Sequence, residues 1–158
     1  MKISKKDFGT HNGQAVTEYT LDNGKNLVVK ILNLGGVIRE INFKGKNRVL
    51  GFDNVEDYIN KRGSIGALIG RVAGRISKGR MEIDGEVYEL DKNEGTSCLH
   101  GGEENFSKKL WTLVEEEVGE EQACISLKYK SADGEAGFPG ELDVLVKYII
   151  DKDDSLTM

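Results

Sequence analysis

Short runs of alternating apolar and polar residues, each closed by a glycine-containing turn, are the feature that most constrains this fold. Asn23-Gly24 separates residues 15–21 from residues 26–32, and Asp84-Gly85 lies between apolar residues of the segment 81–90. Asn-Gly and Asp-Gly between such runs are the strongest short-range signals for a β-hairpin. Further strand patterns cover 37–43, 123–129 and 142–150. The sequence therefore predicts an all-β protein.

Three other segments are less regular. Residues 55–61 fit one or two helical turns. Residues 64–76 carry apolar side chains at helical spacing, but each interior glycine costs a helix about 1 kcal/mol, so an extended or irregular segment is favoured. Residues 155–158 resemble the start of a strand, which would leave a sheet edge exposed. We therefore expect residues 1–158 to form one domain whose sheets are incomplete.

The composition of the chain limits the classes of partner that it is expected to bind. The formal net charge is −5, which argues against nucleic acid, because such partners require a broad positive field. The chain has no apolar run of the roughly 20 residues that a membrane helix needs, and its first residues lack the apolar part of a signal peptide. Cys98 and Cys124 show no paired-motif spacing, so we expect free thiols, a cytoplasmic location and no metal site.

Arg71, Arg75 and His100 are the residues best suited to bind a polar ligand. An arginine presents a fixed fork of donors that fits hydroxyl or carboxylate oxygens. Each arginine could instead be a surface charge, and a lone histidine is more often structural. The hairpin at Asp84-Gly85 offers a way to bring Arg75 and His100 together. Four aromatic residues fit either a sugar-stacking face or, as we favour, the core: Phe106, Trp111, Phe138 and Tyr148.

Five motifs together resemble those of the aldose 1-epimerase (galactose mutarotase) family. They are IGRVAGRISKG at 69–79, the Asp-Gly turn at 84–85, LHGG at 99–102, KLWT at 109–112 and DGEAGFPGEL at 133–142. They occur in the family's order and with similar spacing over most of the chain. Each motif is weak by itself, but the five in order are specific.

The resemblance implies a large antiparallel β-sandwich, of the galactose mutarotase-like supersandwich type, whose concave face binds a free aldohexose. Arg75 and His100 match the family residues that contact sugar hydroxyls. Gly74 stands where the family usually has Asn, and this change removes a side-chain amide from the expected sugar site. Gly74 is therefore the weakest of the three substrate-binding candidates.

The reaction that the resemblance implies is the interconversion of α and β sugar anomers. A base removes the C1 hydroxyl proton and an acid protonates the ring oxygen, so the sugar ring opens and recloses without a cofactor. In the family the acid is a His in a TNHxYFN-type motif and the base is a Glu later in the sequence. Residues 1–158 contain no such motif. We therefore expect no catalytic residue in this chain and little activity from it alone.

Two alternatives remain open. The chain could belong to a hexose-6-phosphate 1-epimerase that uses its arginines to hold an anion. It could also be a non-catalytic carbohydrate-binding sandwich, or one that associates with itself or with a separate C-terminal half.

Overall fold

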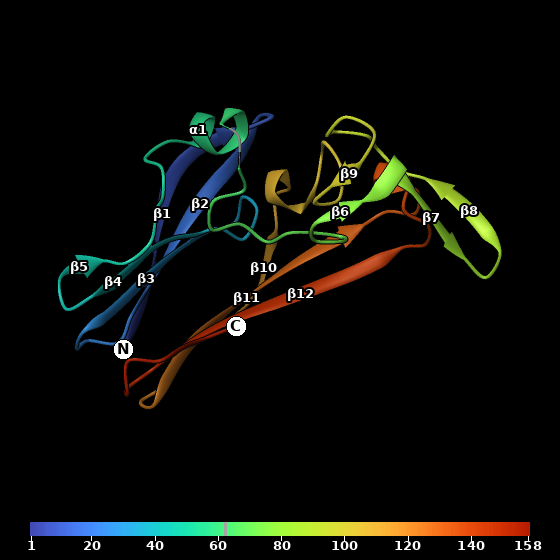
Figure 1. The fold of residues 1–158 in the computed structure, drawn as a ribbon. Helices are drawn as coiled ribbons and strands as arrows, with labels where there is room; N and C mark the ends of the chain where they lie inside the picture. Colours follow the sequence, from blue (N-terminus) through green and yellow to red (C-terminus); the bar gives the residue numbers. More distant parts are fainter. Residues whose placement is uncertain (62) are drawn as a thin grey trace.

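Two antiparallel sheets form most of the protein in a computed structural model, which describes residues 1–61 and 63–158 (Figure 1). The first sheet contains, in spatial order, β1 (Lys2–His11), β2 (Gln14–Asp22), β3 (Leu27–Leu32), β4 (Ile38–Phe43) and β5 (Lys46–Asn47). The second contains β10 (Thr112–Val118), β11 (Gln122–Ser131), β12 (Leu142–Asp151) and β13 (Leu156–Thr157). The all-β, antiparallel prediction is confirmed.

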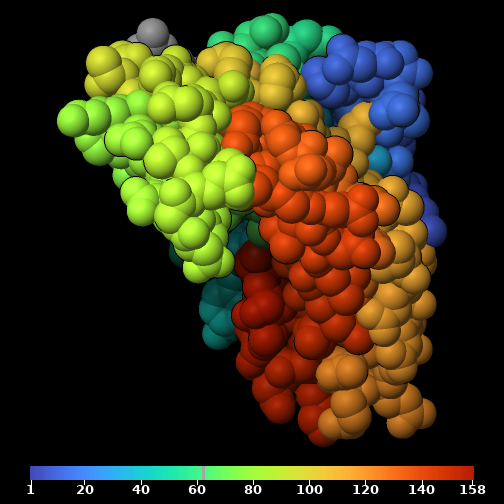
Figure 2. Space-filling view, turned by 90° about the vertical axis from the view of Figure 1, so that its right-hand side faces the viewer, coloured from blue at the N-terminus to red at the C-terminus, as the bar shows by residue number. Residues whose placement is uncertain are grey.

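The segment between the sheets carries the smaller elements. They are α1 (Val55–Asn60), the strand pair β6 (Arg75–Ile76) and β9 (Cys98–Leu99), the hairpin β7 (Arg80–Ile83) and β8 (Glu86–Glu89), and the 3-10 turns η1 (Ser77–Gly79) and η2 (Phe106–Lys108). A third 3-10 turn, η3 (Glu135–Gly137), lies between β11 and β12. Figure 2 shows the β7–β8 hairpin beside the upper part of the second sheet. No helix among the described residues has the length and hydrophobicity needed to cross a membrane.

The core lies between the two sheets. Leu21, Val29 and Ile31 from the first sheet pack in one buried cluster with Ile125 and Leu127 from the second. Their alternation along each strand follows from the two-residue period of β structure, which turns every second side chain inward. Because both sheets contribute to one cluster, the fold is a sandwich.

The four aromatic residues named above are all buried, with exposed fractions between 0 and 6%. Trp111, Phe106 and Tyr148 belong to the cluster between the sheets, and Phe138 belongs to a smaller cluster beneath β6 and β9. The hydroxyl of Tyr148 donates a hydrogen bond of 2.5 Å to the carbonyl oxygen of Gly36, so its polar end is satisfied. The expectation that these rings are core residues is confirmed.

Most predicted strands lie where the sequence pattern places them, and residues 64–74 are irregular as expected. The turn between β2 and β3 is longer than a two-residue hairpin. Asn23 organises it, since its side-chain oxygen accepts hydrogen bonds from the amides of Lys25 and Leu27. The short helix is also confirmed: Asn54 caps α1 by accepting a 2.8 Å hydrogen bond from the amide of Asp57.

A network of ion pairs and hydrogen bonds around Arg39 holds residues 52–53, which lead into α1. The Arg39 guanidinium donates to Glu18 at 2.9 Å, to Asp53 at 2.6 Å and to the carbonyl oxygen of Phe52 at 2.9 Å. Glu18 is buried, whereas Asp53 is almost fully exposed. The Phe52 amide in turn donates to the hydroxyl of Tyr58 on α1. The network therefore ties α1 to the first sheet.

Candidate functional site

The strand pair β6–β9 brings together two of the five sequence motifs, namely GRVAGR at 70–75 and LHGG at 99–102. Arg75 lies opposite Leu99 in the antiparallel register, and Ile76 lies opposite Cys98. The pairing continues one residue further, because the amide of His100 donates to the carbonyl oxygen of Gly74 at 2.8 Å. Gly74, Arg75 and His100 thus form one continuous surface segment, although 25 positions separate the arginine from the histidine.

The side chain of His100 is also held by Gly74. The amide of Gly74 donates to Nδ1 of His100 at 3.0 Å. A backbone amide cannot accept, so Nδ1 must be the unprotonated acceptor, and in the neutral ring the proton lies on Nε2. His100 therefore presents one fixed N–H donor for a ligand oxygen.

Asn93 orders the backbone that carries this histidine. Its side-chain oxygen accepts from the Leu99 amide at 2.7 Å, and its side-chain nitrogen donates to the Leu99 carbonyl oxygen at 3.0 Å. Both backbone groups of the residue before His100 are thereby satisfied. The sequence analysis did not identify Asn93, since a lone asparagine in a polar segment carries no distinctive signal.

The paired glycines after His100 allow a close backbone contact. A Cβ atom on Gly101 would lie 1.9 Å from the carbonyl oxygen of Gly70, and Gly101 has a φ of +92°. Both the contact and the dihedral angle require glycine. The GRVAGR and LHGG motifs therefore support each other through backbone packing.

Arg71 has a structural role in this arrangement. Its guanidinium donates to Ser131 Oγ at 2.9 Å and to the carbonyl oxygens of Pro139 at 2.9 Å and Ala132 at 2.7 Å. Pro139 lies in the DGEAGFPG loop, and Ser131 and Ala132 come directly before it, so the side chain binds both ends of that loop to the 70–75 segment. Of the two arginines, only Arg75 remains a ligand-binding candidate.

Glu135 also binds Ser131, one of the partners of Arg71, and forms a polar cluster with Tyr129, Ser131 and Lys109. It accepts hydrogen bonds from Tyr129, at 2.5 Å, and from Ser131, and it pairs with Lys109 at 3.1 Å. Burial by itself raises the pKa of Glu135, but the Ser131, Tyr129 and Lys109 contacts outweigh it and lower the pKa overall. Glu135 is therefore a fixed carboxylate that supports the loop rather than a proton donor.

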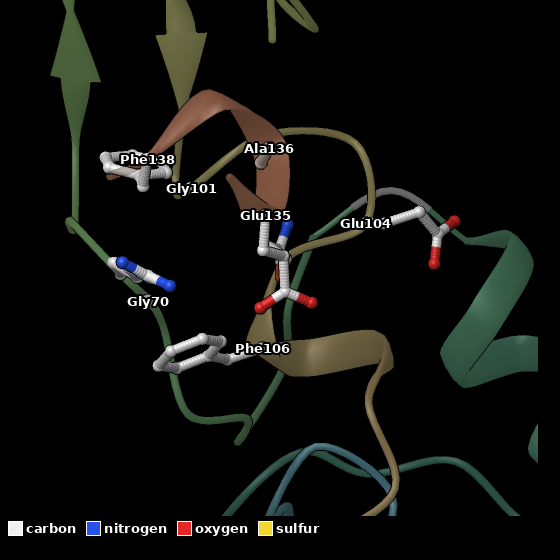
Figure 3. A pocket seen from close by; sticks show the side chains of 9 residues that line it. Gly70, Gly101, Glu104, Phe106, Glu135, Ala136 and Phe138 are labelled. Atoms are coloured by element: carbon white, nitrogen blue, oxygen red, sulfur yellow. The ribbon is translucent and has the colours of Figure 1, made fainter. Parts of the chain in front are cut away.

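Figure 3 shows a narrow hollow beside this cluster, with Glu135 projecting into it from η3 and Phe106 on η2 at its base. A Cβ atom on Gly70 would lie only 2.1 Å from the Phe106 ring, which shows how tightly this region packs. The hollow is too small for a sugar.

A wider pocket of about 660 Å³ lies between α1 and the 93–108 segment. The described residues that line it on the α1 side include Tyr58, Ile59 and Ser64, and His100 and Glu94 line the other side. Such a volume is in the range of small-molecule sites. His100 therefore lines a space large enough for a hexose.

Arg75 lies beside this pocket, and its side chain is 61% exposed. Glu94 binds it through two donors: Nε to one carboxylate oxygen, and Nη2 to the other at 2.7 Å. The hydrogen bond and charge of Arg75 lower the pKa of Glu94, and Glu94 raises the pKa of Arg75 by the same contacts. Both groups are therefore charged across the neutral range.

Elsewhere, the part of the chain that the structure describes contains one group of side chains of the types that bind metals. Ligand atoms of Glu115 and Glu117 on β10 and of the buried Cys124 on β11 lie within 4.8 Å of one another. The ammonium of Lys147 already binds Glu115 at 2.9 Å, and Ser126 donates to the same carboxylate. This positive charge disfavours a cation, so the cluster is better explained as part of the sheet surface.

These features define a class: an antiparallel β-sandwich with an open polar pocket that is lined in part by Leu99 and His100 of the LHGG segment, which pairs with the GRVAGR segment. The chain belongs to the aldose 1-epimerase family, whose model matches residues 17–158. This result confirms the resemblance that the five motifs indicated.

Individual relatives agree with the family assignment. The chain is 39% identical over 158 residues to the galactose mutarotase of Rattus norvegicus, covering 96% of this chain and 44% of the relative. It is 33% identical over 165 aligned positions to the aldose 1-epimerase of Streptococcus thermophilus, covering 100% of this chain and 47% of the relative. The chain therefore spans slightly less than half the length of these relatives.

A solved structure gives the same answer for the fold. The galactose 1-epimerase from Lactobacillus acidophilus superposes with a TM-score of 0.90 at 28% sequence identity, covering 98% of this chain and 46% of that chain. The galactose mutarotase-like sandwich that the resemblance implied is thus confirmed.

Proposed function

We propose that this chain binds a free aldohexose, such as galactose or glucose, as the sugar-positioning part of an aldose 1-epimerase. The observation that carries the proposal is the β6–β9 pairing, which joins Arg75 and His100 in one segment beside the 660 Å³ pocket. His100 offers a single oriented N–H, and Arg75 retains Nη1 after Glu94 has taken Nε and Nη2. Such donors suit the oxygen-rich surface of a sugar.

Proton transfer requires groups that we do not assign to this chain. By resemblance, the family's acid and base lie in motifs that residues 1–158 lack. Glu135 is held by three donors, and Nδ1 of His100 already accepts a hydrogen bond from the Gly74 amide. We therefore assign neither residue as the acid or the base. We propose that further polypeptide, on the same or a separate chain, supplies these groups, and that no cofactor is needed because the reaction moves only protons.

The edge of β12 is where such polypeptide would pair. β13 contacts β12 only at Ile149 and Ile150. β12 pairs with β11 along its other edge. On the edge that faces β13, no described strand pairs with β12 before Ile149. In that unpaired part, Leu142 and Leu145 are 40% and 61% exposed. An open strand edge with apolar side chains favours the addition of another strand. A second copy of the chain is the competing occupant.

A cytoplasmic location completes the proposal. Cys98 and Cys124 are both free and buried, as is usual for proteins of a reducing compartment.

Replacement of His100 provides the test. We expect His100→Ala to weaken galactose binding about 3- to 10-fold in calorimetric titration, because one neutral hydrogen bond contributes roughly 0.5–1.5 kcal/mol. His11→Ala is the matched control, since His11 ends β1 and does not line the described pocket. It should leave the affinity unchanged.

Other outcomes separate the alternatives. Equal affinity of both variants for galactose would remove His100 from the site and count against the proposal. Preference for glucose 6-phosphate over galactose would favour the phosphosugar epimerase instead.

A further inference from the structure

The carboxylate of Glu94 occupies one edge of the only ligand-binding arginine that we assign to the site. Both oxygens of Glu94 are used, one by Nε of Arg75 and the other by Nη2 at 2.7 Å. This two-point geometry is the one that a phosphate group would itself adopt with a guanidinium. An anion approaching Arg75 must therefore displace Glu94 or remain beside its negative charge.

The position of Glu94 is fixed by its neighbours. It follows Asn93, which is bound to the backbone of Leu99, and its own amide and carbonyl groups exchange hydrogen bonds with Ser97. Glu94 therefore belongs to the same ordered turn that carries His100. Glu94 lines the pocket together with that histidine.

Arg75 lies beside the pocket, and the two described cations that line it, Lys61 and Lys108, also have carboxylate partners. Lys61 pairs with Asp57 at 2.9 Å, and Lys108 pairs with Glu103 at 3.3 Å. Among the described lining residues, positive charge is therefore balanced locally. Neutral hydroxyl groups lose little in such a site, whereas a phosphate dianion meets like charge.

We propose that Glu94 is a specificity-determining residue that neutralises Arg75 and makes the site favour neutral sugars over phosphorylated ones. This inference rests on the proposed function, because it concerns the same sugar site. Specificity of this kind depends on the unfavourable contact with the wrong ligand as much as on attraction for the right one. Glu94 supplies that unfavourable contact.

The test compares wild type with Glu94→Gln in NMR titrations with galactose, galactose 6-phosphate and inorganic phosphate. The variant keeps the shape of the side chain but removes its charge. We expect its affinity for both phosphate ligands to rise about 2- to 5-fold, the size of effect typical of exposed charge pairs, and its galactose affinity to change less than 2-fold. Glu120→Gln is the control: it removes the same charge from the β10–β11 turn and should change neither.

Three results would overturn the proposal. Equal effects of Glu94→Gln and Glu120→Gln would show a general effect of net charge. An unchanged phosphate affinity in Glu94→Gln would show that Glu94 does not exclude anions. A loss of galactose affinity without a gain for phosphate would make Glu94 a sugar ligand or a positioning residue.

Inorganic phosphate also separates this proposal from the proposed function. Its binding is followed at the Nε–H signal of Arg75 and requires no sugar contact. If galactose shifts no signal in either variant, the sugar-binding proposal fails, but the phosphate titration still decides the role of Glu94.

Discussion

Gly101→Ala is expected to destabilise the protein by about 2–5 kcal/mol and to abolish detectable galactose binding. The new Cβ atom would lie 1.9 Å from the Gly70 carbonyl oxygen and 2.7 Å from the Arg71 amide nitrogen. Backbone atoms cannot rotate away as a flexible side chain can, and overpacking of this kind typically costs about 1–3 kcal/mol. The positive φ adds roughly 1–2 kcal/mol for a residue with a Cβ atom. Urea unfolding and calorimetry measure the two effects.

Gly85→Ala is the matched control for backbone strain. Gly85 in the β7–β8 turn has a φ of +84°, and a Cβ atom there would meet nothing within 4 Å. This substitution should cost only the strain of the dihedral angle and leave galactose binding intact. If Gly101→Ala lowered the free energy of unfolding no more than Gly85→Ala does, the close contact between Gly101 and the Gly70 carbonyl oxygen would be contradicted.

Arg39→Ala is expected to lower the free energy of unfolding by about 3–5 kcal/mol. The substitution leaves Glu18 buried without its 2.9 Å partner, and an unpaired buried charge carries a penalty of this size. It also removes the hydrogen bond to the Phe52 carbonyl oxygen. For a chain of this length the midpoint of thermal unfolding should fall by on the order of 10 °C.

Two further variants test whether the buried charge is the cause. Adding Glu18→Gln to Arg39→Ala should restore a large part of the lost stability, because the remaining group is neutral. Arg80→Ala, which removes an exposed arginine with only a 3.9 Å contact to Glu89, should cost about 1 kcal/mol or less. A similar loss in Arg80→Ala and Arg39→Ala would contradict the explanation.

The sequence predicted best those strands that are both buried and closed by a turn. β2, β3, β11 and β12 have one face in the core, so their apolar residues alternate visibly. β1 and β10 were not predicted. They are outer strands of their sheets, and most residues of both are at least partly exposed, so polar runs such as EEE at 115–117 hide the two-residue period.

The candidate site was predictable from the sequence only for those residues that lie in local motifs. His100 and Arg75 lie in short, recognisable motifs, and the structure places them together. Arg71 belongs to the same motif, yet its role depends on Ser131 and Pro139, which are 60 and 68 positions away. Glu94 has no motif at all, and only the folded turn places it on Arg75. Pairings over such distances depend on the tertiary fold and leave no local pattern.

Polarimetry of fresh α-D-galactose with the purified 158-residue chain tests the central claim most directly, namely that this chain binds the sugar but does not transfer its protons. At a concentration where calorimetry shows binding, we predict that optical rotation decays at the spontaneous rate. Each absent proton-transfer group removes a factor of about 10²–10⁴ from the rate. Clear acceleration by the chain alone, abolished in His100→Ala and retained in His11→Ala, would contradict the account and place the catalytic groups within residues 1–158.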